Sequence, residues 1–429
     1  MMKKRGILLL GEKIRQIRNE KGISQENMAR AIKSNKSFVQ RVENGIVECS
    51  NEMLARIRNF LEIANAPLLE YEIDMYKDRI WVWNGLLDAN RAAEAREMRN
   101  EMASILDLPF ERELFLLFKM IDIRLLTKEL KLSQVEEELN TVEALLDDAS
   151  DEALFIYHAN MGFICAVKGE YRNSIKHYLQ TLNIVSDYVK PDASVLSNLG
   201  TAYLGLCKPY HCIMYLERVL NEYHIDHIHL DKPRTNAMLA SAYAHVGEYS
   251  KAKELFDISL VQAKSIKHDA LTGVILVNMS YLSCYIGNYE EAVALCDEGL
   301  MYAKNSDIEC LILYRKGIGH FKLKELDKCK QVIERGRVLS KDSERFTTFF
   351  NALEHLMNLN DSKSIKYIEE VAIPFFSTSD NVDKFTALDL CRELEAYYIK
   401  KRTKTKAWAV AATIRSIYED IFFGEIGIE

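Results

Sequence analysis

Polar and basic side chains gather in residues 24–45, SQENMARAIKSNKSFVQRVENG, near the start of the chain. Lys36, Ser37, Gln40 and Arg41 recur at the spacing that puts side chains on one face of a short helix. Ammonium and guanidinium groups bind phosphates, and Arg and Gln can form paired hydrogen bonds with the edges of guanine and adenine. The stretch therefore predicts a surface for nucleic acid and not a catalytic centre.

The charge distribution along the chain agrees with this interpretation. Residues 1–66 hold 13 Lys and Arg against 7 Asp and Glu, a net charge of +6. The whole chain of 429 residues carries −7, so the remainder carries −13. Such a split indicates that the N-terminal segment binds an anionic partner and that the acidic remainder of the chain does not.

Short helices with clear end signals would hold this basic face. A helix over 11–21 ends at Gly22, and Ser24 then caps a second helix through its side-chain oxygen. Asn35 caps a third helix over 36–43. Two short helices joined by a tight turn, within a five-helix unit of about 60 residues, form a helix-turn-helix.

The apolar residues of this unit recur at helical spacing, and these are the predicted core. Lys33 and Ser34 make the turn between the second and third helices, and Gly45 ends the third. A further helical stretch runs from Glu52 to Ile63. The side chains expected to point inward are Ile14, Ile17, Met28, Ala29, Ile32, Val39, Val42, Leu54, Ile57, Phe60 and Leu61.

Over residues 9–65 the sequence resembles the Xre/lambda-repressor-like DNA-binding family. The matching residues are Ser24-Gln25-Glu26, Ala29, Val39, Val42 and Glu43-Asn44-Gly45. One departure is Lys33, where the family usually has a glycine in the turn. The resemblance implies that the third helix enters the major groove of DNA and that Arg18 and Glu43 form a buried pair.

We expect Arg41 to contact guanine, and Gln40 to contact adenine or a phosphate. Gln25, at the start of the second helix, is placed for a phosphate. Phe38 either touches a thymine methyl group or packs at the domain edge. The candidate DNA-binding residues are Gln25, Asn35, Lys36, Ser37, Phe38, Gln40 and Arg41. Such units usually act as dimers on two half-sites, which predicts double-stranded DNA with a palindromic operator as the partner.

The rest of the chain contains an internal repeat. Five segments align from Asn160, Asn198, Met238, Asn278 and Arg315, at intervals of 38, 40, 40 and 37 residues. Each reads as two amphipathic helices around a turn, and the turn contains Gly and an aromatic residue in three of them. The segments resemble the tetratricopeptide repeat. The turn glycine is missing from the second segment, which has Cys207-Lys208-Pro209, and from the fifth, which has Lys324.

Flanking segments have the helical periodicity of further helix pairs, over 72–106, 110–147, 344–377 and 381–422. About nine helix pairs follow residue 70, and each must stack on its neighbours to bury its apolar face. The predicted fold is all-α: an N-terminal lambda-repressor-like domain and a right-handed superhelix with a concave groove. The expected domains are a helix-turn-helix over 1–66, a linker and first pair over 67–107, a peptide-binding array over 108–380, and capping or dimerisation helices over 381–429.

Asn160, Asn198 and Asn278 recur at one position of the first helix in their repeats. A carboxamide there either binds the backbone of an extended peptide or bonds the neighbouring helix as a repeat residue. Nearby residues of the same surface would add specificity. The candidate peptide-binding residues are Asn160, Asn198, Arg234, Asn236, Ser241, Asn278, Tyr281 and Tyr285.

A helix-turn-helix followed by a long repeat array is similar to the RRNPP group of peptide-pheromone-responsive regulators, with its NprR-, PlcR- and Rgg-like members. The resemblance implies that a short signalling peptide binds the groove and changes the arrangement of a homodimer or higher oligomer. The alternative is a Rap-like module that inhibits or dephosphorylates a response regulator, also conceivable as a second function. The helices of 67–147 would supply the N-terminal bundle of such a module.

The sequence offers little for other classes of function. It contains no P-loop, GxGxxG, HExxH or nucleophile elbow, so we expect no enzyme and no cofactor. The stretch YHIDHIHLDK, residues 223–232, fits no zinc signature and reads as an inter-repeat loop, so no metal is expected. Nine cysteines without a CxxC pair indicate reduced thiols of a cytoplasmic protein, and no apolar run is long enough for a membrane span.

Overall fold

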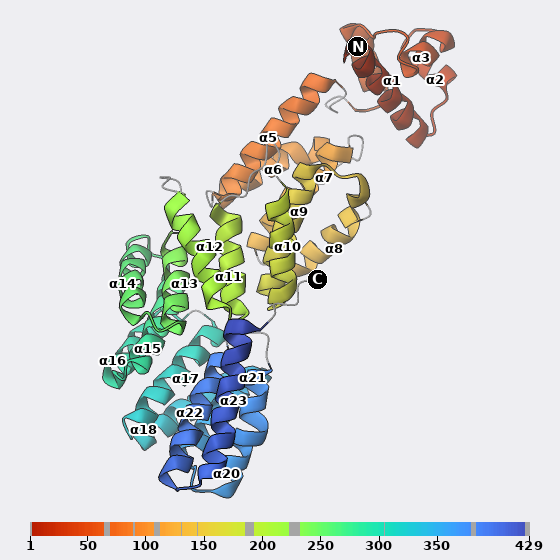
Figure 1. The fold of residues 1–429 in the computed structure, drawn as a ribbon. Coiled ribbons are helices and arrows are strands. Elements are labelled where there is room, and N and C mark those ends of the chain that lie inside the picture. Colours follow the sequence, from red (N-terminus) through yellow and green to blue (C-terminus); the bar gives the residue numbers. More distant parts are fainter. Residues whose placement is uncertain are drawn as a thin grey trace. The chain divides into compact units, whose positions relative to one another are not determined.

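The computed structural model describes residues 2–63, 69–88, 91–106, 112–129, 131–143, 145–184, 193–222, 232–303, 305–378 and 383–424. Throughout these ranges the regular structure is helical and no strand is present. The chain divides into two compact units (Figure 1). One comprises residues 1–160 with 183–190, and the other comprises 161–182 with 191–429.

The first unit begins with the helix-turn-helix. Its helices are α1 (Met2–Glu20), α2 (Gln25–Ala31), α3 (Lys36–Glu43) and α4 (Asn51–Phe60). The predicted third helix is confirmed over its full range. The first helix starts nine residues earlier than predicted. In the described part of residues 1–66 four helices are present, so the expectation of five was wrong.

The helix ends follow the predicted chemistry. The Ser24 hydroxyl accepts a hydrogen bond from the Asn27 amide at 3.1 Å, and Asn35 Oδ1 accepts one from the Phe38 amide at 2.8 Å. Lys33, in the turn between α2 and α3, has a φ of 55°. This is the left-handed conformation that glycine adopts without steric cost, so Lys33 keeps the turn of the family at some backbone strain.

The helix-turn-helix has a core of its own. Its buried apolar side chains come from all four helices and from the segment that follows α4: Ile14, Ile17, Met28, Ala29, Ile32, Val39, Val42, Leu54, Ile57, Leu61 and Ile63. Phe60 packs against this core from its edge. Burial of the predicted apolar face therefore orients α3 so that its opposite face meets solvent.

Five further helices belong wholly or mainly to the first unit. They are α5 (Glu70–Asp88), α6 (Ala92–Leu106), α7 (Arg112–Lys128), α8 (Leu132–Glu143) and α9 (Asp151–Val167), with a short 3₁₀ turn at Leu146–Asp148. α7 is buried almost all round, since α5, α6 and α8 pack against it.

The second unit contains the remaining helix pairs. They are α10 (Tyr171–Asn183), α11 (Ala193–Gly205), α12 (Pro209–Glu222), α13 (Lys232–His245), α14 (Tyr249–Ser265), α15 (Asp269–Tyr285), α16 (Tyr289–Leu300), α17 (Ser306–Lys322), α18 (Leu326–Leu339), α19 (Glu344–Met357), α20 (Ser362–Tyr367), α21 (Ile373–Ser377), α22 (Lys384–Lys400) and α23 (Lys404–Phe423). A π-helical turn at Ile368–Ala372 joins α20 to α21. Counted from α5, the described helices make nine pairs, as predicted.

One turn geometry recurs in all five aligned repeats. The second residue after the first helix has a positive φ in each: 79° at Gly169, 58° at Cys207, 86° at Gly247, 83° at Gly287 and 61° at Lys324. The two repeats that lack glycine therefore adopt the same turn. Stacking against neighbouring repeats holds this conformation even where the side chain disfavours it.

Small residues let the two helices of a pair approach closely. Ser174, Ala252 and Ala292 occupy equivalent positions and have no exposed surface. The Ser174 hydroxyl donates a hydrogen bond to the Gly162 carbonyl at 2.7 Å.

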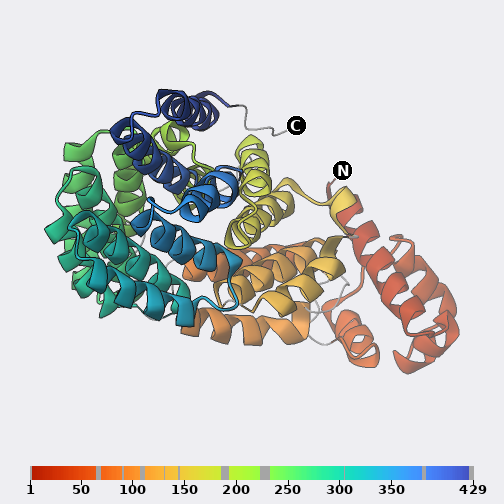
Figure 2. The same cartoon turned by 90° about the horizontal axis from the view of Figure 1, so that it is seen from below.

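Within the second unit the helix pairs follow an arc, and its last pair meets one of its first (Figure 2). Lys208 Nζ, at the start of α12, donates hydrogen bonds to the carbonyls of Asp420 at 2.5 Å and Gly424 at 2.8 Å. Tyr210 and Phe422 bring their rings within 5.6 Å. The carbonyls at the C-terminal end of a helix carry partial negative charge, so this lysine stabilises the end of α23. The superhelix of the second unit is thus closed by contacts between α12 and α23.

Candidate functional site

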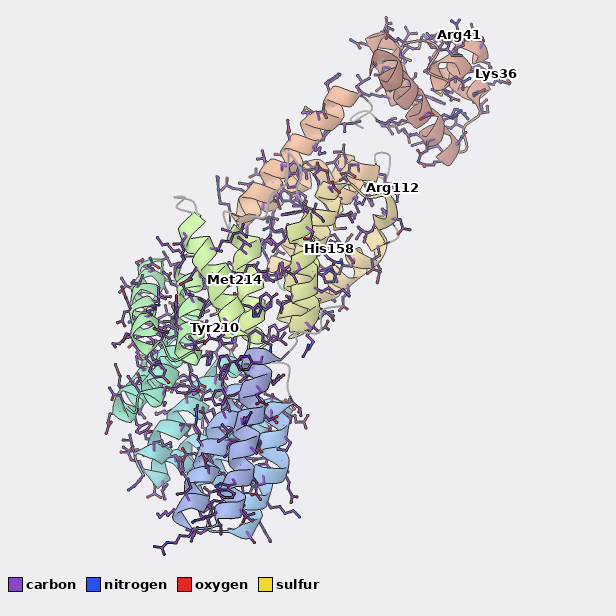
Figure 3. All side chains as sticks on the ribbon, in the orientation of Figure 1. Lys36, Arg41, Arg112, His158, Tyr210 and Met214 are labelled. Atoms are coloured by element: carbon purple, nitrogen blue, oxygen red, sulfur yellow. The ribbon has the colours of Figure 1, made fainter. Side chains whose placement is uncertain are left out.

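The exposed face of α3 carries the predicted basic and polar side chains. Lys36, Ser37, Gln40 and Arg41 are all exposed. Lys36 and Arg41 point away from the domain in Figure 3. Within the described ranges neither Lys36, Gln40 nor Arg41 has an ion pair or a hydrogen bond from its side chain. Their charge and donors are therefore available to an external partner.

A buried ion pair holds α3 against α1. Arg18 Nε lies 2.6 Å from Glu43 Oε1, and Arg18 Nη2 lies 3.0 Å from Glu43 Oε2. The carboxylate is 1% exposed and the guanidinium 8%. This confirms the pair that the family resemblance implied, and its two parallel hydrogen bonds fix the end of α3.

The remaining candidates on α2 and α3 have defined environments. Gln25 Nε2 donates to Glu43 Oε2 at 2.8 Å, so its amide already has a partner in the free protein. Asn35 is the side-chain cap of α3. Phe38 is partly buried against the domain core, which is the packing alternative of the two considered for it.

A second surface lies on the first helices of the repeats in the second unit. On α11, α13, α15 and α17 the partly exposed side chains recur four, three and four residues apart, which forms one helical stripe. We call these four stripes the inner face. Asn198, Met238, Asn278 and Arg315 occupy one of its equivalent positions. Gly205, His245, Tyr285 and Lys322 occupy another, two helical turns later.

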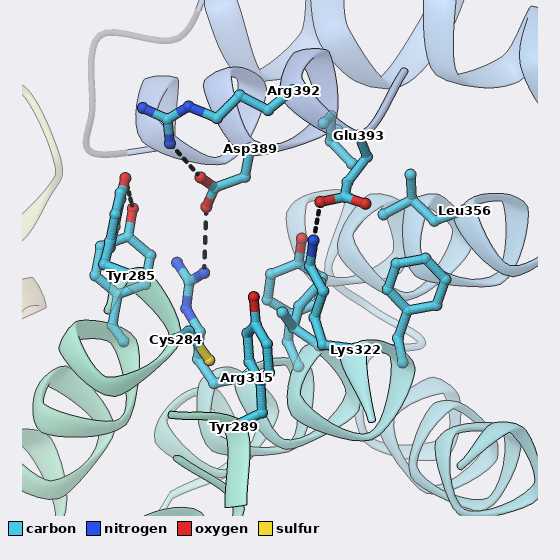
Figure 4. A pocket seen from close by; sticks show the side chains of 14 residues that line it. Cys284, Tyr285, Tyr289, Arg315, Lys322, Leu356, Asp389, Arg392 and Glu393 are labelled. Carbon is cyan, nitrogen blue, oxygen red and sulfur yellow. Dashed lines mark hydrogen bonds and ion pairs between the residues drawn. The ribbon is translucent and has the colours of Figure 1, made fainter. Parts of the chain in front are cut away.

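Two cavities adjoin the inner face. The first, of about 230 Å³, is lined by Ser241, His245, Asn278 and Tyr281 among others, and by Phe385 from α22. The second, of about 190 Å³, is lined by Tyr281, Tyr285, Arg315 and Lys322, and by Asp389 and Glu393 from α22 (Figure 4). Four of the eight candidate peptide-binding residues thus meet here: Ser241, Asn278, Tyr281 and Tyr285.

The other four candidates lie elsewhere. Arg234 donates to Asn198 Oδ1 at 3.0 Å, so these two form their own pair on the inner face, and neither lines the cavities. Asn160 is 4% exposed and donates to the Met120 carbonyl at 2.7 Å. Asn236 is equally buried and donates to Gln262 at 3.3 Å. The Asn160 carboxamide therefore bonds a neighbouring helix, the alternative that was considered for the recurring asparagine, and the Asn236 carboxamide bonds α14.

The recurring carboxamide at Asn278 differs from these buried ones. Asn278 Nδ2 donates to the Ser241 hydroxyl of the preceding repeat at 3.3 Å, a long hydrogen bond at the cavity wall. Arg315 and Arg345 line the same cavity. Asn278 can therefore still bind the backbone of a guest peptide.

Sequence reasoning missed the charged residues of this site. The Arg315 guanidinium lies 3.9 Å from the centre of the Tyr281 ring and 3.8 Å from Asp389 of α22. Arg315 aligns with Asn278 in the repeat, so its place on the inner face was readable from the alignment. The approach of α22 was not, because 74 residues separate Arg315 from Asp389.

Burial shifts the pKa values of two groups here. Desolvation, with the nearby positive charge of Arg315, lowers the pKa of His245 to about 3, so the imidazole is neutral at pH 7. Its Nδ1 atom is buried and has no hydrogen-bond partner within the described structure. Desolvation raises the pKa of the Asp389 carboxyl, and Arg315 and Arg392 oppose that shift.

The other features singled out from the sequence add no site. Of the stretch 223–232, residues 223–231 lie outside the described residues. Among the residues that are described, no group of His, Cys, Asp and Glu has the arrangement of a metal site. All nine cysteines are free thiols, and no helix in the described ranges is long and apolar enough to cross a membrane.

Comparisons with known proteins match the helix-turn-helix and most of the chain. Residues 14–64 match the helix-turn-helix family model. The transcriptional activator NprA of Geobacillus stearothermophilus is 22% identical over 386 residues, which are 86% of this chain and 93% of NprA.

Solved structures share the fold. The apo form of the quorum sensor NprR from B. thuringiensis superposes with a TM-score of 0.65 at 18% identity, covering 80% of this chain and 99% of NprR. A Rap protein complexed with competence and sporulation factor gives a TM-score of 0.69 at 15% identity, covering 81% of this chain and 99% of Rap.

Fold and surfaces together define a helix-turn-helix protein with a tetratricopeptide-like array. The chain thus joins a helix-turn-helix match over residues 14–64 to a similarity with NprA that extends over most of both proteins.

Proposed function

We propose that the protein is a cytoplasmic quorum-sensing transcription regulator that binds DNA through α3 and a short signalling peptide on the inner face of its array. The observation that carries the proposal is the exposed face of α3, where Lys36, Gln40 and Arg41 have no partner within the described residues. Free cations on the third helix of a helix-turn-helix are the residues that meet DNA in this class of domain.

The relatives support the two halves of the proposal. NprA is named a transcriptional activator, and NprR has been solved in complex with its cognate peptide NprX. In this protein, Asn278 and Ser241 of the inner face are the groups that would hold the peptide backbone. The peptide changes DNA binding only if it prefers one arrangement of the array over another.

DNA binding is tested with the full chain and labelled fragments of the intergenic regions beside its gene. A homodimer that neutralises about six phosphates gives log K against log salt a slope of roughly −5. Specific retention of one fragment, lost in Arg41→Ala, supports the proposal. Equal binding of all fragments by both proteins contradicts it.

Peptide binding is tested by calorimetry of the full chain against short peptides encoded beside its gene. We expect Asn278→Ala to weaken binding more than Asn198→Ala, because Asn198 accepts a hydrogen bond from Arg234 and lies outside the two cavities. If neither substitution changes the affinity, the inner face is not the peptide site.

A Rap-like activity on a response regulator is the second candidate. The observation that favours it is a charged cleft of about 390 Å³ between α6, α7 and α8, lined by residues that include Arg96, Arg99, Glu129 and Lys131. Loss of phosphate from a phosphorylated response regulator in the presence of the protein would support this candidate. A phosphorylation level that the protein leaves unchanged would exclude it for that regulator.

A further inference from the structure

Arg315 is a cation that the two cavities beside the inner face share. Within the described ranges, only Arg315 and Tyr281 line both of them. The guanidinium lies over the Tyr281 ring, 3.9 Å from its centre, so the stacked pair forms part of the wall of each cavity. Both cavities are open to solvent, and the Arg315 side chain is 16% exposed. A guest can therefore reach this guanidinium while α22 stays in place.

The other three cations that line the cavities each donate a hydrogen bond to a carboxylate. The three pairs are Arg345 with Asp383, Lys322 with Glu393, and Arg392 with Asp389. A charge-assisted hydrogen bond of this kind satisfies both partners at once. These cations are therefore already committed to acidic groups of the protein.

The Arg315 guanidinium has no such hydrogen bond. Its ion-pair partner is Asp389, at 3.8 Å, which is too long for a hydrogen bond (Figure 4). Asp389 instead accepts a hydrogen bond from Arg392 at 3.1 Å. Among the described residues, no acceptor lies within hydrogen-bond distance of the five N–H donors of Arg315. An external anion can supply the missing acceptors.

The charges that line the cavities indicate what kind of anion this is. The cations are Arg315, Lys322, Arg345 and Arg392, and the carboxylates are Asp383, Asp389 and Glu393. Four positive charges against three negative ones leave an excess of +1, since His245 is neutral at pH 7. A single carboxylate balances this excess. A phosphate group, which carries nearly two negative charges at pH 7, exceeds it.

Apolar and aromatic side chains make up most of the remaining lining. Leu311 and Phe349 belong to the first cavity, and Ile318 and Leu356 to the second. Such surroundings accept apolar groups of a ligand, and a few polar groups among them fix its orientation. They also strengthen a hydrogen bond to a charged group, because the local dielectric constant is low. The site thus suits a carboxylate with apolar groups beside it.

We propose that the Arg315 guanidinium binds one carboxylate of the signalling peptide through paired hydrogen bonds, and that apolar side chains next to this carboxylate enter the two cavities. The inference rests on the proposed function, because it gives the chemistry of the guest at the same site. A guanidinium and a carboxylate match each other in two parallel N–H···O bonds. The side chain of Asp or Glu and the C-terminus of the peptide both offer this group, and the test separates the two sources.

The test uses the full chain and four heptapeptides that are labelled at the N-terminus and have Leu and Phe on either side of a central residue. Three of them are amidated at the C-terminus and carry Asp, Asn or Lys at the centre. The fourth carries Asn at the centre and has a free C-terminal carboxylate. Fluorescence anisotropy gives the Kd of each peptide.

We expect a carboxylate peptide to bind at least about tenfold more tightly than the amidated Asn peptide, and the Lys peptide to bind least. Tighter binding of the Asp peptide assigns the carboxylate to a side chain. Tighter binding of the peptide with the free C-terminus assigns it to the terminus.

Variants of the protein show whether Arg315 is the group that reads the carboxylate. Arg315→Gln should reduce the preference for the carboxylate to about twofold or less, because a neutral amide gains little from a charged acceptor. Affinity for the amidated Asn peptide should remain, which a variant that merely unfolds would lose. Asp389→Asn removes the acidic neighbour of Arg315 and should raise the preference by at least about threefold, so it keeps the test valid if Arg315→Gln fails to fold.

Arg335→Gln is the matched control. Arg335 is an exposed cation of α18 that pairs with Glu309 and lines neither cavity, so its loss should change none of the Kd values.

A carboxylate preference that persists unchanged in Arg315→Gln overturns this inference, and so does tightest binding of the amidated Asn peptide or the Lys peptide. Peptides still bind in either case, so the proposed function stands. If the protein binds none of these heptapeptides and none of the peptides encoded beside its gene, the proposed function and this inference fail together.

Discussion

The cations of the two proposed binding surfaces differ in whether they have partners within the protein. On α3, Lys36 and Arg41 are exposed and have no ion pair among the described residues. On the array, Arg315, Lys322 and Arg345 each meet a carboxylate of α22. The α3 cations are therefore open to an external partner, whereas the array cations already interact within the protein.

In the helix-turn-helix one buried ion pair adds to the stability of the apolar core, and breaking this pair is the largest effect we expect. Arg18→Ala leaves the Glu43 carboxylate buried without its guanidinium, which costs about 3–5 kcal/mol. Thermal denaturation should show early unfolding of this domain, and DNA binding should be lost. Glu26→Gln removes only an exposed pair with Arg30, so it should leave the melting curve unchanged.

Arg41→Ala should weaken specific DNA binding by about 1–3 kcal/mol, a roughly 5- to 150-fold rise in Kd. Because Arg41 is exposed and unpaired in the described structure, the melting temperature should not move. Anisotropy titrations with the retained DNA fragment measure the effect, and Arg415→Ala on α23 is a matched loss of an exposed cation. Equal affinities for the two variants would mean that α3 does not read DNA.

The two regions should also differ in their response to pH. The pKa of His245 falls to about 3 on folding, so the folded array takes up no proton there while the unfolded chain does below about pH 6.5. Stability from this group is therefore full above pH 6.5 and decreases as the pH falls, by at most about 2 kcal/mol at pH 5.

Denaturant titrations at pH 7 and pH 5 measure this loss, and His245→Gln should reduce it. The helix-turn-helix has no histidine in residues 2–63, so its unfolding should lack this contribution. A pH dependence that is identical in His245→Gln and the original protein would show that His245 is not buried in its neutral form.

The smallest expected effect is on the free energy of unfolding, and it comes from a strained backbone conformation that occurs in both regions. Lys33 has a φ of 55° and Lys324 a φ of 61°. At each site glycine should be more stable than alanine by about 1 kcal/mol, because only glycine adopts this conformation freely. The denaturation midpoints of a Gly variant and an Ala variant at each site measure this difference in stability. A stabler alanine variant at either site would contradict the turn geometry described there.

Local features were predictable from the sequence because they depend on neighbouring residues. The capping oxygens of Ser24 and Asn35, the bounds of α3 and the three glycine turns of the repeats follow from residue type and spacing within a few positions. The pair between Arg18 and Glu43 was expected from the family resemblance alone. Local spacing does not predict it, since 25 residues separate the two side chains.

By itself, then, the sequence determined that this chain pairs a basic helix-turn-helix with about nine helix pairs, because helical period, caps and turns are short-range properties. Only the tertiary structure decided which recurring asparagine faces a cavity and which is buried: Asn278 is at the wall, and Asn160 bonds α7. It also decided that α22 meets the inner face. That contact depends on small rotations added over several repeats, and no single repeat specifies their sum.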